Sequence, residues 1–111
     1  MSIYNEKTLE KKIEKESGVI LKLPMIEKTN FITFGILEIA SGKNTKEHSH
    51  DTGEEFMFII EGDGCIILDE KRHEITKGDL IFIKSHQRHQ IINVSKKYLK
   101  LLFGVSPPLD F

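Results

Sequence analysis

Apolar and polar residues alternate in short runs along most of the chain. The runs are rich in Ile, Phe and Val and are separated by Gly, Asp, Asn and Pro, a pattern typical of β-strands joined by turns. The expected strands are residues 18–23, 31–40, 45–50, 54–61, 64–69, 72–76, 79–84, 88–94 and 97–105. Because they are short and the turns are tight, they predict an all-β fold, an antiparallel sandwich or barrel.

The start of the chain has a different character. Residues 5–17 are good helix formers, with Asn5 as a capping residue and Gly18 as a stop. The apolar stripe of this segment is narrow, so we expect a short helix on the surface. The predicted organisation is a helical segment over residues 1–17, followed by one β-barrel domain over residues 18–111.

Two of the expected strands are apolar on both faces. They are Phe56-Met57-Phe58-Ile59-Ile60 and Leu80-Ile81-Phe82-Ile83. Such strands must be covered on both sides, because either face would otherwise expose large apolar side chains to water. We expect the interior to cover one face and a second sheet or a partner subunit to cover the other.

Composition and charge exclude several classes of function. At 111 residues the chain suits a single core, and 16 basic against 17 acidic side chains argue against a nucleic-acid partner. The apolar runs are too short to cross a membrane, and the N-terminus lacks the apolar centre of a signal peptide. We therefore expect a cytoplasmic protein with no membrane partner. Cys65 is the only cysteine and cannot form an internal disulfide.

The candidate chemistry begins in the stretch GKNTKEHSHDTGEEFMFIIEG, residues 42–62. His48 and His50 are two residues apart, so on an extended strand both imidazoles point to the same side. The turn-forming sequence Asp51-Thr52-Gly53 allows the next strand to bring a carboxylate back toward them. Alternation puts Glu55 on one face with Met57 and Ile59 and Glu54 on the other with Phe56 and Phe58. Because both faces are apolar, either carboxylate remains a candidate at this point.

A second candidate strand carries His89, which shares one face with Ile91 and Asn93. If this strand lies beside the first stretch in a closed barrel, His89 supplies a third imidazole at the same point. Three imidazoles and a carboxylate suit a divalent transition metal ion such as manganese, iron, nickel or zinc.

The spacing of these residues resembles that of a known family. Gly42, five residues, His48-x-His50, four residues, Glu55, six residues and Gly62 are similar to the first motif of the cupin family. The fixed spacing before Gly62 also singles out Glu55 as the carboxylate. The resemblance implies a jelly-roll barrel, an antiparallel double-stranded β-helix, with a metal held by His48, His50, Glu55 and His89, and a homodimer formed through the outer sheet.

The second cupin motif is matched less completely. Gly78, His89 and Asn93 fit it, but Lys84 and His86 stand where the family usually has Pro and Gly. Without these residues the turn before His89 can differ from that of the family, and His at a turn position with positive φ costs about 1 kcal/mol.

Four further residues are candidates for roles near the metal. His86 could fold over the site as a catalytic proton donor, although a single loop histidine is more often simply exposed. Asn93 is interpreted as structural or as a support beside the ligands. Met57 and Phe82 are candidates for the wall of a substrate pocket, the alternative for Phe82 being plain core.

The resemblance implies a metal-dependent enzyme that acts on a small oxygenated substrate, either a dioxygenase or an isomerase or lyase of sugars or keto acids. The family fold does not choose among these reactions. The alternatives are a sensor or accessory protein that binds a small molecule without turning it over, and a degenerate barrel that holds no metal.

Overall fold

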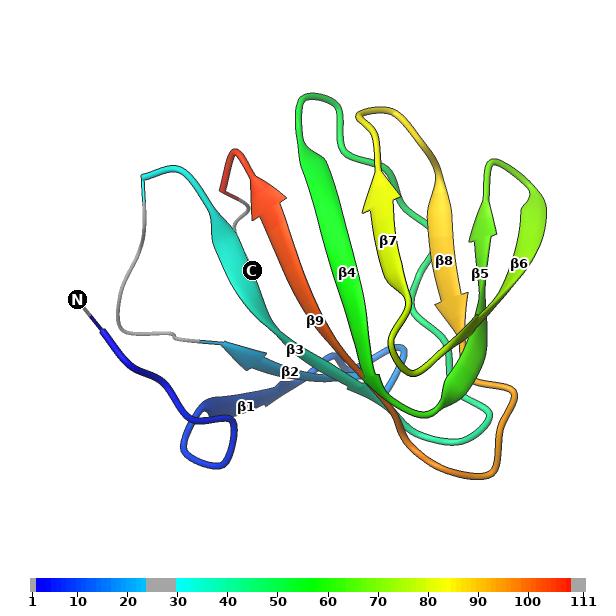
Figure 1. Cartoon of the computed structure of the whole chain (residues 1–111), viewed down its shortest axis with the longest axis horizontal. Helices are drawn as coiled ribbons and strands as arrows, with labels where there is room; N and C mark the ends of the chain where they lie inside the picture. The colour runs from blue at the N-terminus through cyan, green and yellow to red at the C-terminus, as the bar shows by residue number, and fades with distance from the viewer. Residues whose placement is uncertain (1, 24–29, 109–111) are drawn as a thin grey trace.

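The computed structural model describes residues 2–23 and 30–108, which form two antiparallel sheets and no helix (Figure 1). The strands are β1 (Glu10–Ile13), β2 (Ile20–Leu23), β3 (Thr33–Ile39), β4 (Glu54–Glu61), β5 (Asp63–Leu68), β6 (Lys71–Thr76), β7 (Leu80–Ile83), β8 (His89–Ile92) and β9 (Leu99–Ser106). The all-β jelly-roll prediction is confirmed. Within the described residues, no helix is long and apolar enough to cross a membrane.

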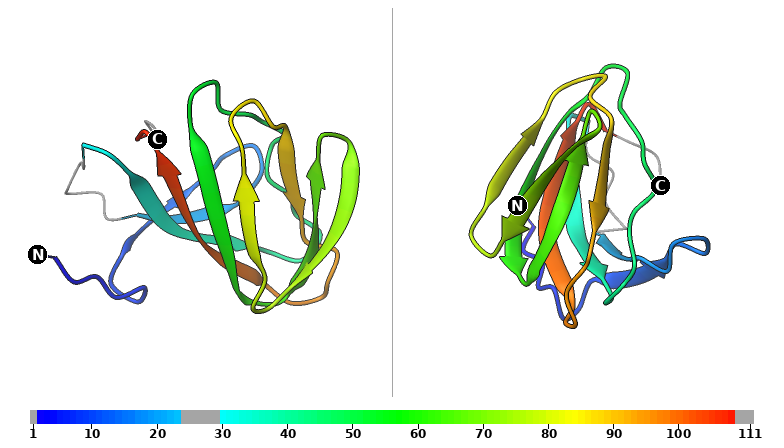
Figure 2. Two further views of the ribbon diagram at one scale, coloured as in Figure 1. Left: turned by 45° about the horizontal axis from the view of Figure 1, so that its top comes forward. Right: turned by 90° about the vertical axis from the view of Figure 1, so that its right-hand side faces the viewer.

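The larger sheet has six strands in the order β1-β2-β3-β9-β4-β7, and the smaller has three in the order β6-β5-β8. β9 lies between β3 and β4, so the end of the chain joins two strands that are far from it in sequence. Figure 2 shows the two sheets from two further directions, with the chain crossing between them at the turns after β4, β6, β7 and β8.

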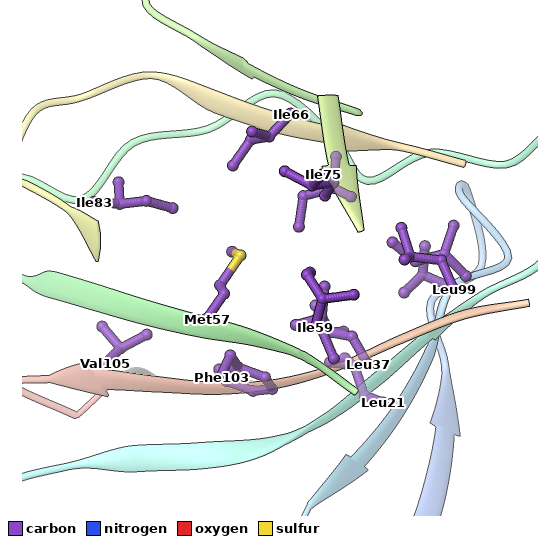
Figure 3. Close-up of a cluster of buried hydrophobic side chains, with 14 residues drawn as sticks. Leu21, Leu37, Met57, Ile59, Ile66, Ile75, Ile83, Leu99, Phe103 and Val105 are labelled. Carbon is purple, nitrogen blue, oxygen red and sulfur yellow. The ribbon is translucent and has the colours of Figure 1, made fainter. Parts of the chain in front are cut away.

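The core lies between the sheets and is built by period-two alternation. On β4, Glu55, Met57 and Ile59 are buried, whereas Glu54, Phe56 and Phe58 are exposed on the other face. The smaller sheet contributes Ile91 to the same cluster, together with Ile66 and Ile75, which are labelled in Figure 3. The expected strands, apart from residues 45–50, form within two residues of their predicted ends.

The predicted helix over residues 5–17 is wrong. Asn5 does cap a turn, since its side-chain oxygen accepts the Lys7 N–H at 2.9 Å, but the chain then enters β1 and pairs with β2 in a hairpin. Helix propensity was overridden because a stripe of two apolar residues cannot anchor a helix, whereas the β2 edge offers a complete ladder of backbone partners. Gly18, expected to stop the helix, instead takes φ 74° in the hairpin turn.

The expected strand over residues 45–50 is also wrong. This segment runs beside β8, but it is paired there only by two isolated bridges, Asn44 with Ile92 and His48 with His89. Between the bridges, the Ile91 N–H donates to the hydroxyl oxygen of Thr45 at 2.9 Å, so a side chain takes the place of a ladder carbonyl. The segment therefore stays extended without joining the sheet.

Candidate metal centre

The four predicted ligands converge at one end of the barrel. Glu55 lies near the start of β4, His89 begins β8, and His48 and His50 lie on the segment that leads into β4. One ligand atom from each of these residues can be chosen so that all four lie within 4.8 Å of one another. The bend at 51–52 reverses the direction of the chain, as the sequence predicts, and Gly53 is buried behind it.

Backbone carbonyls orient two of the imidazoles. His48 Nδ1 lies 2.8 Å from the Lys46 carbonyl oxygen, and His89 Nδ1 lies 3.0 Å from that of Gln87. Because a carbonyl oxygen can only accept, each Nδ1 carries the proton of the neutral ring and each Nε2 presents a lone pair toward the cluster. This is the arrangement that supports histidine ligands in metal proteins.

Glu55 is the acidic centre of the cluster and is only 5% exposed. Its Oε1 lies 3.0 Å from His50 Nε2, in hydrogen-bond geometry, and 3.2 Å from His89 Nε2. His89 Nε2 is nevertheless the one buried side-chain N or O atom without a hydrogen-bond partner in the described part of the chain. A buried nitrogen lone pair beside a buried carboxylate is a donor set that fits a divalent metal ion.

The imidazoles differ in their electrostatics. Burial lowers the pKa of His48, and the neighbouring imidazoles contribute in the same direction. Burial also acts to lower the pKa of His89, but the Glu55 carboxylate and the Gln87 carbonyl outweigh it and raise this pKa above its ordinary value. Protonation is therefore disfavoured at His48, whereas at His89 a proton competes with a metal ion for Nε2.

A cavity of about 300 Å³ opens from the cluster toward the core. Away from the four candidate ligands, most of its wall is apolar: Val19, Leu21, Leu37, Met57, Ile91, Phe103 and Val105. Figure 3 shows Met57 next to Phe103 on the inner face of the larger sheet, with Leu37 further along beside Ile59. The cavity therefore lies at the cluster end of the core, and Leu99, at the other end, does not line it.

The other predicted site residues lie in varied places. Met57 lines the cavity, as expected. Phe82 points outward from β7 and is 56% exposed, so it neither lines the cavity nor belongs to the core, because β7 turns its other face inward. Asn93 is fully buried and structural, since its amide donates to the carbonyls of Ile39 and Lys97 at 2.8 and 2.7 Å.

His86 is exposed and does not line the cavity, so its position gives no support to a catalytic role. Its backbone N–H donates to the His50 carbonyl at 2.7 Å, and Ser85 Oγ donates to the Gly53 carbonyl at 3.0 Å. The turn between β7 and β8 thereby holds the segment that carries His50. The departures from the second cupin motif fall in this supporting turn.

Sequence reasoning missed the part of the cavity wall that comes from the β1–β2 hairpin. Val19 and Leu21 line the cavity from β2 and the turn before it, and Glu14, Ser17 and Lys46 lie at its rim. Lys46 Nζ lies 2.6 Å from a Glu16 carboxylate oxygen and 3.7 Å from one of Glu14. The alternation of Val19 and Leu21 indicated that one face of this strand is buried. Because a helix was expected before the strand, nothing in the sequence suggested that the two segments form a hairpin beside the site.

A family model for the cupin domain matches residues 35–105. The chain belongs to the cupin family. An uncharacterized protein of Methanocaldococcus jannaschii is 35% identical to this cupin over 98 residues, which cover 86% of this chain and 78% of the relative. The tetracenomycin polyketide synthase protein TcmJ of Streptomyces glaucescens is 26% identical over 73 residues, covering 66% of this chain and 49% of TcmJ. The chain spans about half the length of the three Streptomyces relatives that it matches.

Solved structures share the fold of this cupin. A protein described as a predicted oxalate decarboxylase of Thermotoga maritima has a TM-score of 0.83 at 19% identity, covering 95% of this chain and 98% of that one. The polyketide cyclase RemF of Streptomyces resistomycificus has a TM-score of 0.83 at 17% identity, covering 96% and 79%. At these identities the likeness shows the fold alone, and the two descriptions already differ in chemistry.

Proposed function

We propose that this cupin is a metal-dependent enzyme that acts on a small oxygenated substrate. The observation that carries the proposal is the convergence of four ligand atoms within 4.8 Å of one another at the end of a cavity of about 300 Å³. Three imidazoles and one carboxylate suit manganese, iron, nickel or zinc. When bound, such an ion supplies Lewis-acid or redox chemistry at an oxygen of the substrate.

The residues of the chain have separate roles in this proposal. Glu55 supplies the negative charge that offsets the charge of a cation in a buried place. The carbonyls of Lys46 and Gln87 keep Nε2 of His48 and His89 free to bind. The apolar wall beyond them keeps water from one side of the substrate, which strengthens every polar interaction at the cluster.

Metal content tests the site. Purified protein loaded with Zn²⁺ or Mn²⁺ and then dialysed should retain about one ion per chain, measured by elemental analysis. His89→Ala should lower the affinity by tenfold to a hundredfold or more, because it removes one of four ligands. His73→Ala on the exposed β6 is the matched control and should leave metal content unchanged. A wild type that retains no metal would refute the proposal.

The reaction type is tested by metal exchange. A dioxygenase requires a redox-active ion, so turnover and oxygen uptake should appear with iron or manganese and disappear with zinc. An isomerase or lyase that uses the ion to polarise a carbonyl should keep activity with zinc and consume no oxygen. A metabolite screen on each loaded form, with product analysis and an oxygen electrode, distinguishes the two.

A second candidate is a protein that binds a small molecule without turning it over. One observation favours it: apart from the cluster, the ionisable residues that line the described cavity are Glu14 and Lys46, and these are paired with each other at the rim. No separate acid or base therefore stands free in the described wall. Compounds that stabilise the metal-loaded protein in the screen but are recovered unchanged would support the binder over the enzyme.

A further inference from the structure

The cavity wall is organised in rows across the larger sheet. Paired residues of neighbouring antiparallel strands present their side chains on the same face. Glu55 pairs with Val105, and one step deeper Met57 pairs with Phe103. Deeper still, Leu21 pairs with Leu37. A molecule that binds the cluster through one end would therefore lay the rest of its body against purely apolar rows.

The few polar groups of the wall already have partners. The hydroxyl of Thr45 accepts the Ile91 N–H at 2.9 Å, and the carboxylate of Glu14 accepts the Ser17 N–H at 2.6 Å. The one cationic side chain in the described wall besides the imidazoles is Lys46, which is 2.6 Å from Glu16. A phosphate or a second carboxylate on the substrate would have to compete with Glu14 and Glu16 for this cation.

Burial then decides which molecules fit. Each hydroxyl placed against the rows of Met57 and Leu37 loses its water without gaining a partner, at a cost of about 1–3 kcal/mol, whereas apolar surface gains about 25 cal/mol per Å². A volume of about 300 Å³ is at the small end for ligand pockets. The rows therefore suit a compact body of one or two rings, or an equivalent branched chain.

We propose that this cupin selects substrates with an apolar body and an oxygen donor at one end, and that it discriminates against sugars, polyols and phosphorylated compounds. The proposal rests on the metal-dependent function proposed above and assigns its substrate class. Met57, Phe103, Leu21 and Leu37 are the residues that set the specificity.

Hydroxamates test it, because acetohydroxamate, benzohydroxamate and gluconohydroxamate share one metal-binding head and differ only in the body. Each is titrated into the Zn²⁺-loaded protein by calorimetry, and its affinity is divided by its affinity for free Zn²⁺. We expect this corrected affinity to be at least about tenfold higher for benzohydroxamate than for acetohydroxamate, and lowest for gluconohydroxamate.

A wall variant locates the effect. Met57→Thr should lower benzohydroxamate affinity about threefold to tenfold and leave acetohydroxamate affinity within twofold, which also shows that fold and metal site are intact. Leu102→Thr, on the outward side of β9, is the control and should change neither. If Met57→Thr fails to fold, Leu37→Thr provides the same comparison one row deeper.

The outcomes separate the two proposals. A protein that takes no Zn²⁺ refutes the metal-dependent function and the substrate class with it. A protein that takes Zn²⁺ but binds all three hydroxamates equally, binds gluconohydroxamate best, or binds none, refutes the substrate class and leaves the metal-dependent function standing.

Discussion

His86 has a left-handed backbone, with φ 66°, in the turn where the family usually has glycine. A residue with a Cβ atom destabilises the folded state by about 1–2 kcal/mol in this conformation. Glycine removes this cost, but it also raises the entropy of the unfolded chain, which cancels part of the gain. We expect His86→Gly to raise the free energy of unfolding by about 0.5–1 kcal/mol and to leave Zn²⁺ affinity unchanged, measured by urea denaturation and calorimetry.

Lys84→Gly provides the control for His86→Gly, since Lys84 is exposed in the same turn and its φ is not positive. It should lower stability by a similar amount. A His86→Gly variant that loses Zn²⁺, or that loses turnover at full stability, would show instead that the side chain works at the site, as the sequence hypothesis of a catalytic His86 holds.

His89 makes metal binding depend on pH. Its pKa is raised above about 6.5, so in the metal-free protein its proton must leave before Nε2 can bind an ion. Zn²⁺ affinity should therefore be level at high pH and begin to fall while the pH is still above 6.5, approaching tenfold per unit. The lowered pKa of His48 moves its protonation to a lower pH than that of His89.

The same raised pKa gives the opposite trend for metal-free stability. The stabilisation from protonated His89 is fully present below the unfolded pKa of about 6.5 and is lost as the pH rises through the folded pKa.

The dependence of Zn²⁺ binding on the protonation of His89 is measured by calorimetric Zn²⁺ titrations between pH 5.5 and 8.5, repeated in two buffers to count the released protons. An affinity that is level down to pH 6 with no proton release would contradict it.

At the scale of single residues, the sequence predicted the positions that follow from the spacing of residues along a strand or a motif. The cupin spacing before Gly62 selected Glu55, alternation put Glu54 on the opposite face, and the structure shows Glu55 buried and Glu54 exposed. The same rule could not place Phe82, because a strand that is apolar on both faces carries no signal for which face meets the core. Nor does spacing reveal that the side-chain amide of Asn93 is engaged in hydrogen bonds to two backbone carbonyls.

The element that the sequence misjudged is β1, the outer strand of the β1–β2 hairpin that forms one side of the cavity. Its local signals were helical, whereas β2 falls within the expected strand over residues 18–23, and β1 forms because β2, paired with β3, offers it a strand edge. Pairing to such an edge has no trace in local propensity. The hairpin turn is joined to the ligand-bearing segment through Lys46, which contacts both Glu14 and Glu16.

This contact makes the turn a testable element. Ion pairs at a surface contribute about 0.2–1 kcal/mol, so Lys46→Ala should speed amide hydrogen exchange at Ser17 and Gly18 by up to about fivefold. Hydrogen bonds from Ser17, which lower the pKa of Glu14 to about 2, remain in the variant and limit the effect. Exchange measured by NMR should be unchanged in Lys96→Ala, an exposed lysine in the β8–β9 loop. Equal exchange in wild type and Lys46→Ala would show that Lys46 does not hold the turn.

For the whole molecule, the outer face of the larger sheet remains partly uncovered. Phe56 and Phe58 on β4 pair with Phe82 and Leu80 on β7, the edge strand, and their side chains are 37%, 40%, 56% and 71% exposed. The N-terminal segment contacts the neighbouring strands β3 and β9, through the Tyr4–Phe34 ring contact and the ion pair between Glu6 and Lys100. The sequence predicted a cover for these strands, and this chain supplies none in its described part.

We expect a second copy of the chain to cover this apolar patch, because the same surface on both partners is self-complementary about a two-fold axis. The wild type should then have about twice the 12.8 kDa mass of one chain, measured by sedimentation equilibrium. Replacing Phe58 and Leu80 by lysine puts charges at paired positions in the patch and should give the single-chain mass without loss of Zn²⁺. Val94→Lys, an exposed apolar site in the β8–β9 loop, should leave the mass doubled. The prediction is contradicted if the wild type has the mass of one chain at 0.1 mM, a concentration roughly a hundredfold above a micromolar Kd.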